Sequence, residues 1–430
     1  MRPLSTRVSQ SEGSGIRDVF DEVDRLRERG IDCISLAVGE PSFDPPAFVA
    51  QAAAERESSP AGMKYAPIKG MPELREAICD YNRSVKHLDY DIEETQVTTG
   101  ATLGIQQSIQ ALVDHGDEII VCSPTFPAYA LEARMCGGRA VDVPTRVEDA
   151  FHPRADAIER AITPRTKAIV INNPGNPTGA VITPAELADI AAVAIRHDLW
   201  VISDEVYHRY AYDGREVRSI ATLPGMRERT IVLESCSKTY AMTGYRIGWM
   251  NGPRDVIDRT STTQEFATSS TNTAAQYAAL AALRGPQDQI GAMLLDYGEK
   301  RREVIDGLAA SPWIDLPVPE GAFYAFPCIR RTGMDADAFA MGLLREQHVA
   351  VVPGTAFGAA GKGFVRLSYA GDKSEIAEAM RRMVAFAQAH APVGAGASAG
   401  ARAGAERAGA ERARVISFGG QAAAVRRAAA

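Results

Sequence analysis

The chain has 430 residues, of which 46% are hydrophobic and 23% are charged. This composition is typical of a soluble globular protein and excludes collagen-like and wholly disordered chains. The formal charge of −7 is mildly acidic, so we expect no nucleic-acid partner, because such binding needs clustered Lys and Arg. No apolar run approaches the roughly 18 residues of a membrane-spanning segment, so no membrane partner is expected. The spacing of the six cysteines predicts no metal site or disulfide framework and fits a reducing cytoplasm.

The length allows two or three domains, and apolar periodicity divides the chain into alternating helices and strands. In chain order, helices are predicted at 16–29, 72–84, 101–113, 184–196 and 373–388. Strands are predicted at 96–99, 118–122, 168–172, 199–203 and 230–234. Runs such as A-I-V-I-N are apolar throughout, which is typical of parallel strands covered on both faces. The alternation therefore predicts an α/β fold.

The two ends of the chain differ from this body. Residues 391–430 form an Ala-rich and Arg-rich segment with an A-G-A-E-R repeat and few large apolar residues. Such a segment cannot bury enough apolar area to offset its chain entropy, so we expect a disordered tail. Residues 1–13 are expected to be a flexible N-terminus.

Polar groups follow four of the predicted strands, at the ends where ligands bind in open α/β sheets. The first strand is followed by G-A-T, which opens a helix, and the third by the heptad N-P-G-N-P-T-G at 173–179. The next two are followed by D-E-V-Y at 204–207 and by S-C-S-K at 235–238. Taken singly, G-A-T and D-E-V-Y could each cap a helix, the heptad could be a turn, and Lys238 could be a solvated surface lysine. Their convergence at one sheet edge favours a binding site.

Together with other motifs, these segments resemble the pyridoxal-phosphate aminotransferases of class I/II, which have fold type I. The resemblance covers about residues 14–388 and is closest to the bacterial and archaeal branch of aspartate and aromatic amino-acid aminotransferases. The motifs that carry it, besides the heptad, are S-L-A-V-G-E-P (35–41), K-Y-A-P-I-K-G (64–70), S-P-T-F-P-A-Y (123–129), S-D-E-V-Y (203–207), S-C-S-K-T-Y-A-M-T-G-Y-R-I-G (235–248), G-A-F-Y (321–324) and V-R-L-S-Y-A (365–370).

The resemblance implies a two-domain architecture and a homodimer with shared sites. The large domain would span 46–285 and hold a mostly parallel sheet with the cofactor, pyridoxal 5′-phosphate. The smaller α+β domain would combine 14–45 with 286–390, and the substrate would lie between the two.

The resemblance also implies roles for individual residues. Lys238 would form the Schiff base with the cofactor aldehyde and move the substrate Cα proton, and Asp204 would keep the pyridine nitrogen protonated. Asn176 and Tyr207 would hydrogen-bond the ring hydroxyl, and Phe126 would stack on the ring. His208 is expected to support the site rather than transfer protons, and Cys236 is expected to pack.

The phosphate and the substrate carboxylate have their own implied binding groups. Arg366 would bind the α-carboxylate by a bidentate pair, near Asn176, and Gly39 would let the backbone approach it. The phosphate would sit at a helix N-terminus, with a tyrosine added by a second subunit. The implied phosphate residues are Gly100, Ala101, Thr102, Ser235, Ser237, Arg246 and, from the other subunit, Tyr65.

The implied reaction transfers an amino group from an L-amino acid to a 2-oxo acid such as 2-oxoglutarate by a ping-pong mechanism. Ile16 and Thr102 stand where aspartate-specific relatives would carry polar or basic groups, which favours a broad or aromatic preference and leaves aspartate open. Arg17 could meet a second carboxylate or face solvent. A C–S lyase or synthase on the same scaffold is an alternative. A non-enzymatic, aminotransferase-like ligand sensor is another, although the retained Lys238 argues for chemistry.

Overall fold

The computed structural model describes residues 4–9, 15–60, 62 and 64–392. The expected C-terminal tail at 391–430, apart from its first two residues, lies outside the described residues, as does most of the expected flexible N-terminus. Within that N-terminus the helix α1 (Thr6–Ser9) is described, and Arg7 donates a hydrogen bond to the Met135 carbonyl. No helix in the described ranges is long and apolar enough to cross a membrane.

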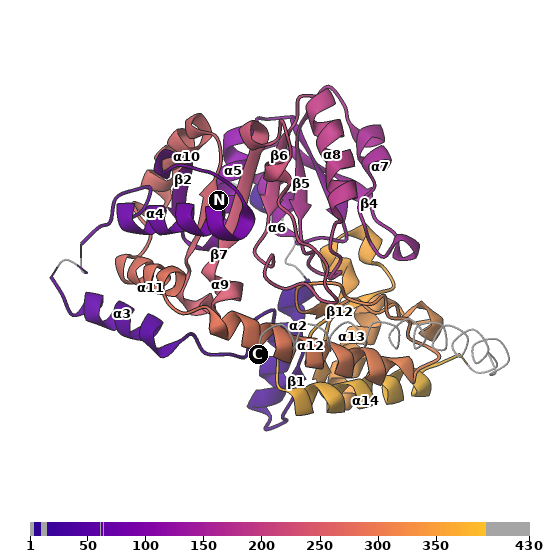
Figure 1. Cartoon of the computed structure of the whole chain (residues 1–430). Coiled ribbons are helices and arrows are strands. Elements are labelled where there is room, and N and C mark those ends of the chain that lie inside the picture. The colour runs from indigo at the N-terminus through magenta and orange to yellow at the C-terminus, as the bar shows by residue number, and fades with distance from the viewer. Residues whose placement is uncertain (1–3, 10–14, 61, 63, 393–430) are drawn as a thin grey trace, which may run out of the picture.

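Helices and strands alternate along most of the chain (Figure 1). The longer helices are α2 (Gly15–Glu28), α3 (Ala47–Glu57), α4 (Pro72–Tyr81), α5 (Gly100–Leu112), α6 (Ala128–Met135), α7 (Ala155–Ala161), α8 (Pro184–Arg196), α10 (Arg254–Thr268), α11 (Thr273–Arg284), α12 (Asp288–Ala309), α13 (Ala336–Gln347) and α14 (Lys373–Ala389), and α9 (Cys236–Thr239) is a single turn. The strands are β1 (Ile34–Ser35), β2 (Thr95–Thr98), β3 (Glu118–Ser123), β4 (Arg139–Pro144), β5 (Thr166–Asn172), β6 (Trp200–Asp204), β7 (Thr230–Ser235), β8 (Gly248–Asn251), β9 (Tyr324–Ala325), β10 (Val349–Ala350), β11 (Val352–Pro353) and β12 (Val365–Ser368).

The main sheet has seven strands in the order β2-β8-β7-β6-β5-β3-β4. Strands β4, β3, β5, β6 and β7 run parallel, whereas β8 is antiparallel to both β7 and β2. All five predicted strands are present in this sheet, and the mostly parallel α/β architecture is confirmed. Strands β3, β5, β6 and β7 were predictable because they lie inside the sheet and contain continuous apolar runs.

Helices cover both faces of this sheet. Side chains of α5, α6 and α10 pack against one face, and those of α7 and α8 pack against the other. Helices α3, α4 and α11 form a further core around β2 and β8. The result is a three-layer arrangement, which occupies the upper part of the molecule in Figure 1.

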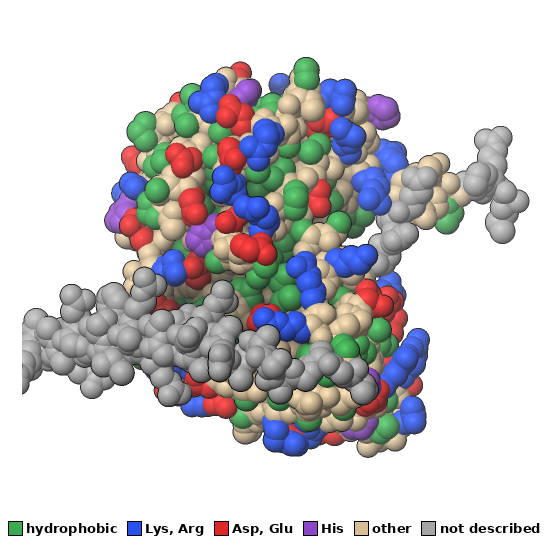
Figure 2. Space-filling model, turned by 90° about the vertical axis from the view of Figure 1, so that its right-hand side faces the viewer, with side chains coloured by type: hydrophobic (Ala, Val, Ile, Leu, Met, Phe, Trp, Pro, Cys, Tyr) green, Lys and Arg blue, Asp and Glu red, His purple; other side chains and the backbone are tan. Residues whose placement is uncertain are grey.

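A second group of elements lies below the main sheet in Figure 1. It contains the antiparallel sheet β11-β12-β9, the parallel pair β1-β10, and the helices α12, α13 and α14, which share a core with β9 and β12. These elements fit the expected α+β part, and the domain boundaries drawn from the sequence stay a prediction. On the face shown in Figure 2, acidic, basic and hydrophobic side chains are interspersed, as the small net charge suggests.

One predicted helix ends early. The segment 72–84 was expected to be one helix, but α4 ends at Tyr81 and a π-helical turn follows at Asn82–Lys86. The Asn82 side chain is buried and donates to Asn251 Oδ1 at 2.9 Å. A buried amide that needs a partner outside its own helix explains the change in winding at this point.

A histidine joins the main sheet to the loop before β9. The His152 ring lies between Glu186, at the start of α8, and Glu320, at 2.8 Å from each carboxylate. Glu320 also accepts from the Val181 backbone N–H at 3.0 Å. Both ring nitrogens face carboxylates, an arrangement that favours the doubly protonated, charged ring. The bond to Glu320, and then that to Glu186, raises the pKa of His152 against the opposing effect of burial.

This arrangement predicts a pH-dependent stability. Because the folded-state pKa of His152 is raised above its unfolded value of about 6.5, the stabilisation is complete below that value and is lost as the pH rises through the raised pKa. We expect His152→Gln to lower the free energy of unfolding by about 1–2 kcal/mol at pH 6 and by less at pH 9, as measured by urea denaturation.

His197 provides the control, because its ring pairs with one exposed carboxylate, Glu159, at 2.9 Å. His197→Gln should change the free energy of unfolding by less than about 0.5 kcal/mol. An equal loss for His152→Gln at both pH values would contradict the assignment of a charged ring.

Candidate active site

A cavity of about 390 Å³ opens at the carboxyl ends of β5, β6 and β7. The strand ends contribute Asn172, Asp204 and Ser235, and segments from the rest of the chain close the other sides. The remaining lining residues are Ile16, Phe20, Ala37, Val38, Gly39, Glu40, Ala101, Thr102, Ile105, Phe126, Tyr129, Asn176, Val206, Tyr207, Ser237, Lys238, Thr243, Arg246, Tyr324 and Arg366.

The structure brings together nearly all the residues expected at the site. Of the predicted set, only Gly100 and Tyr65 do not line this cavity. Gly100 lies directly behind it, at the start of α5, whereas the Tyr65 side chain is 86% exposed. Tyr65 therefore points away from the cavity of its own chain.

Lys238 is the central amine of the cavity. It lies in the single turn α9 just after β7, and the Tyr210 hydroxyl donates to its backbone carbonyl at 2.7 Å. Its Nζ donates to the Gly39 carbonyl at 2.5 Å. Burial lowers the pKa of Lys238 to about 8, and the charges of Arg366 and Arg246 act in the same direction against that of Glu40. The amine is therefore partly neutral near physiological pH.

Asp204 is a buried carboxylate at the end of β6. Its Oδ2 accepts a hydrogen bond from the Tyr129 hydroxyl at 2.7 Å, and its Oδ1 lies 3.3 Å from the Val206 backbone N–H. Burial raises the pKa of Asp204 to about 6, while these two hydrogen bonds oppose the rise. The carboxylate thus remains mainly ionised at pH 7 and can stabilise a cationic group.

The start of α5 and Arg246 form an anion-binding corner. Gly100 has φ +70°, and a Cβ built on it would lie 2.6 Å from Arg246 Nη2. The guanidinium is fixed by a 2.9 Å bond from Nη1 to the Thr243 carbonyl. Across the corner, Ser235 Oγ and Ser237 Oγ are 2.9 Å apart. A helix N-terminus, two hydroxyls and an arginine suit a phosphate group.

Arg366 lies on β12, on the opposite side of the cavity. Its guanidinium carbon is 4.8 Å from the Tyr324 ring centroid and 4.9 Å from that of Phe357, so the group is held between two aromatic rings. It donates to the Ala37 carbonyl and, at 3.3 Å, to Asn176 Oδ1. Its Nε is buried without a hydrogen-bond partner among the described residues. This arrangement leaves donor capacity for a carboxylate.

Gly39 leaves space for Tyr324, and its expected role beside the substrate carboxylate stays a prediction. A Cβ on Gly39 would lie 2.1 Å from the Tyr324 hydroxyl. That hydroxyl is 2.8 Å from the Tyr207 hydroxyl, and both tyrosines are buried. Glycine at position 39 therefore makes room for a pair of phenols beside Arg366.

The wall on the α2 side of the cavity is mainly apolar. Ile16 and Phe20 lie one turn apart on α2 and line the cavity together with Ile105 and Thr102. Arg17, for which the sequence left two alternatives, is exposed and does not line the cavity. The cations that line this cavity are Lys238, Arg246 and Arg366.

Two tyrosines were missed as site residues by the sequence reasoning. Tyr129 and Tyr324 both lie within motifs noted above, S-P-T-F-P-A-Y and G-A-F-Y, and that membership was the available signal. Phe126 lies edge to face with Tyr129 at 5.9 Å. Cys236 is fully buried, and burial raises the pKa of its thiol, in keeping with a packing role.

The sequence and the fold both match known aminotransferases. The family described as aminotransferase class I and II matches residues 31–383. An aromatic-amino-acid aminotransferase of Thermococcus litoralis is 38% identical over 384 residues, covering 88% of this chain and 97% of that protein. An aspartate aminotransferase of Pyrococcus abyssi is 39% identical over 386 residues, covering 88% of this chain and 97% of that protein.

Solved structures agree with these relatives. The aromatic aminotransferase of Pyrococcus horikoshii superposes with a TM-score of 0.81 at 39% identity, covering 85% of this chain and 99% of that chain. The aspartate aminotransferase of Thermus thermophilus with maleate superposes with a TM-score of 0.85 at 38% identity, covering 90% of this chain and all of that chain. The chain belongs to the class I and II aminotransferase family, and it is an aminotransferase of fold type I.

The contact between Gly100 and Arg246 leads to a prediction. Gly100→Ala places a methyl group where the guanidinium lies and strains a backbone at φ +70°. We expect the affinity for pyridoxal phosphate to fall by about tenfold or more, through the loss of a charge-assisted contact. Titration of the purified protein with the cofactor, followed by visible absorbance, measures this affinity.

Gly116→Ala is the matched control for backbone strain. Gly116 has φ +89°, and no described heavy atom lies within 4 Å of the position that an added methyl group would take. This variant should lose stability but keep its affinity for the cofactor. Equal cofactor affinities for the two variants would show that Arg246 does not depend on the space left by Gly100.

Proposed function

We propose that the protein transfers the amino group of an L-amino acid to a 2-oxo acid, with pyridoxal 5′-phosphate bound at Lys238. The observation that supports it most directly is that a partly neutral lysine, a buried carboxylate and a partly unpartnered arginine share one cavity. A ping-pong sequence suits this arrangement, because one carboxylate site can receive the amino acid and the 2-oxo acid in turn. Six free cysteines suit the cytoplasm.

The residues present fit this cofactor. The corner formed by α5, Ser235, Ser237 and Arg246 suits its phosphate, and the glycine at position 100 leaves the space that Arg246 needs. Asp204 would pair with the ring nitrogen, and Asn176 and Tyr207 would hydrogen-bond the ring hydroxyl. When bound, the cofactor supplies an aldehyde that condenses with an amine and a ring that accepts electrons from the substrate Cα.

The chain's own residues would then divide the work. Lys238, with its pKa lowered to about 8 by burial, would supply the neutral amine that holds the cofactor and would later take the proton from the substrate Cα. Asp204 would hold a proton at the ring nitrogen, and Tyr129 holds Asp204 in place through the 2.7 Å hydrogen bond. Phe126 would cover one face of the ring.

Arg366 would orient the substrate. The two aromatic rings that hold the guanidinium fix its plane, so that it can bind both oxygens of an α-carboxylate and direct Cα–H towards Lys238. Approach of the α2 and β12 elements towards the main sheet would exclude water during proton transfer.

The side-chain pocket supports a broad or aromatic preference. Ile16, Phe20 and Ile105 offer apolar surface, whereas the exposed Arg17 lies outside the cavity. An apolar wall favours apolar side chains by a few kcal/mol at most, so aspartate remains within the proposed range and 2-oxoglutarate is one acceptor. A homodimer is part of the proposal, in which the exposed Tyr65 of each chain reaches the phosphate of the other.

A half-reaction tests the proposed function. The protein loaded with pyridoxal phosphate is mixed with a single amino acid and no acceptor. An aminotransferase converts its cofactor to the pyridoxamine form and releases the matching 2-oxo acid. A C–S lyase would instead release pyruvate and ammonia from a cysteine-type substrate and retain its original spectrum, and that result would overturn the proposal. A donor panel of aromatic amino acids, aspartate and glutamate then ranks the substrates.

The role of Lys238 gives the next prediction. Lys238→Ala should abolish the visible absorbance of the covalently bound cofactor and lower turnover by several orders of magnitude, because the amine is both nucleophile and base. Lys167→Ala, which removes an exposed lysine near Asp117, should leave both unchanged. Ordinary turnover in Lys238→Ala would contradict the assignment.

A separate prediction concerns Arg366. Arg366→Lys keeps the charge but loses the second parallel hydrogen bond to a carboxylate. We expect the transition-state stabilisation calculated from kcat/KM to fall by about 2–4 kcal/mol. The factor should be similar for all amino-acid donors, and the cofactor absorbance should be retained. If steady-state kinetics showed a loss for dicarboxylic donors alone, Arg366 would bind the side-chain carboxylate instead.

A further inference from the structure

A buried charge cluster lies behind the strand ends that carry the active site. Lys86, in the π-helical turn that follows α4, places its Nζ 2.5 Å from Glu205 Oε2 and 2.6 Å from Glu234 Oε1. The three side chains are only 3%, 3% and 1% exposed. A lysine is seldom buried so completely, and burial of three charged groups has a large desolvation cost. Packing alone therefore does not account for the burial of these three charged side chains.

The carboxylates have further partners. Glu205 Oε1 accepts from Ser203 Oγ and Ser219 Oγ, both at 2.7 Å. Glu234 Oε1 lies 2.8 Å from His208 Nδ1, and the other ring nitrogen of His208 lies 2.7 Å from the Tyr81 hydroxyl. The other ionisable groups that face the cluster are Tyr90 near Glu205, Asp204 and Cys236 near Glu234, and Tyr240 and Arg209 near Tyr81.

The two glutamates and His208 each adjoin a residue of the site in the sequence. Glu205 follows Asp204, His208 follows Tyr207, and Glu234 precedes Ser235. Glu234 and Ser235 are successive residues of the extended strand β7, so their side chains point to opposite sides: Ser235 lines the cavity, and Glu234 does not. The strands meet here as well, because the Glu205 backbone N–H donates to the Leu233 carbonyl at 3.0 Å. Lys86 thus connects the ends of β6 and β7 from behind.

The cluster also acts on the site through its charge. Burial first, and then the charges of Glu234 and Glu205, raise the pKa of Asp204. Burial disfavours the charged form of Lys86, but the two glutamates outweigh it and raise the lysine's pKa, so its charge persists. Lys86 supplies the positive charge that faces the carboxylates of Glu205 and Glu234. Its removal would leave both carboxylates behind Asp204 without this countercharge.

We propose that Lys86 is a positioning residue for the aminotransferase site: it joins the ends of β6 and β7 and offsets one of the two carboxylates behind Asp204, so that Asp204 keeps its place and its charge. The inference rests on the proposed function, because it assumes that Asp204 meets the cofactor. It adds a residue that lies outside the cavity and touches neither the cofactor nor the substrate.

The test follows the visible absorbance of the cofactor-loaded enzyme as a function of pH. The transition reports the proton on the nitrogen that joins the cofactor to Lys238. Lys86→Met adds one net negative charge behind the site, which favours the protonated form. We expect the midpoint to move to higher pH by about half a unit or more, and the dissociation constant for pyridoxal phosphate to rise by about tenfold or more.

Two further variants test whether the direction of the midpoint shift follows the net charge behind the site. Glu234→Gln removes one negative charge and should move the midpoint to lower pH. The double variant Lys86→Met/Glu234→Gln restores the wild-type net charge and should return the midpoint close to its original value. If Lys86→Met fails to fold, Glu234→Gln still tests the charge effect, because its predicted shift is measured against the wild type.

Arg165→Met is the matched control. Arg165 pairs with buried Glu118 at 2.7 Å, at the amino end of β3 and thus at the opposite edge of the sheet. This variant should lower the melting temperature and leave the absorbance midpoint and cofactor affinity unchanged.

The outcomes separate the two proposals. If Lys86→Met lost thermal stability but kept the wild-type midpoint and cofactor affinity, the cluster would be structural only and the inference would be overturned. The same conclusion would follow if Glu234→Gln moved the midpoint upward. If the wild-type chain itself did not bind pyridoxal phosphate, the proposed function would be contradicted, independently of the role of Lys86.

Discussion

The parallel pairing of β5, β6 and β7 is the constraint on which the active site depends. Asn172 pairs with Asp204, and Asp204 pairs with Leu233, so the three strands end at one level of the sheet. The chain leaves each strand there with a different polar group. The alignment of the strand ends therefore suffices to bring together an amide, a carboxylate and the turn that carries Ser235 and Lys238. Helix α5 adds its N-terminus because β8, antiparallel to β2 and β7, brings Gly248 next to it.

The cavity concentrates positive charge before any substrate binds. Lys238, Arg246 and Arg366 share it, and the charges of the two arginines lower the pKa of the lysine. Like charges that share one cavity destabilise the folded protein, which is a common feature of ligand-binding sites. A phosphate and a carboxylate are the two anions that would relieve the repulsion. The fold holds the three cations at the turn α9, before β8 and on β12, so binding of the anions would relieve a repulsion that is present without them.

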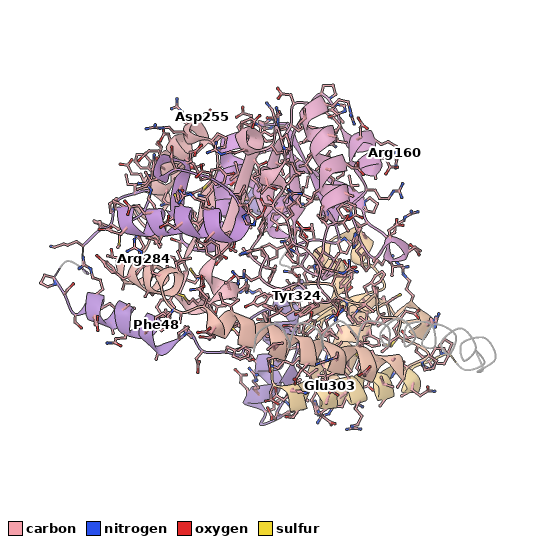
Figure 3. All side chains as sticks on the ribbon, in the orientation of Figure 1. Phe48, Arg160, Asp255, Arg284, Glu303 and Tyr324 are labelled. Atoms are coloured by element: carbon pink, nitrogen blue, oxygen red, sulfur yellow. The ribbon has the colours of Figure 1, made fainter. Side chains whose placement is uncertain are left out.

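Sequence patterns predicted the strands of the main sheet better than the side chains that support the site. The inner strands β3, β5, β6 and β7 were recognisable by their apolar runs, and the motifs located Lys238, Asp204 and Arg366. Two strands were missed: the edge strand β4, which is mostly not buried, and β8, whose sequence G-W-M-N is short and has no distinctive pattern. Tyr129 and Tyr324 were not assigned roles, since a tyrosine that supports another side chain through space leaves no spacing rule in the sequence. Tyr324 lies between the main sheet and the α12 layer, as Figure 3 shows.

The contact between Gly39 and Tyr324 joins two parts of the chain that are far apart in sequence. Figure 3 labels Tyr324 near the middle of the molecule, where the two layers meet. Any side chain at position 39 would have to displace the tyrosine hydroxyl, and with it the partner of Tyr207 and one ring that holds Arg366. The sizes of the side chains at positions 39 and 324 therefore depend on each other: a larger residue at 39 requires a smaller one at 324, and Arg366 would then lose one of the two rings that flank it.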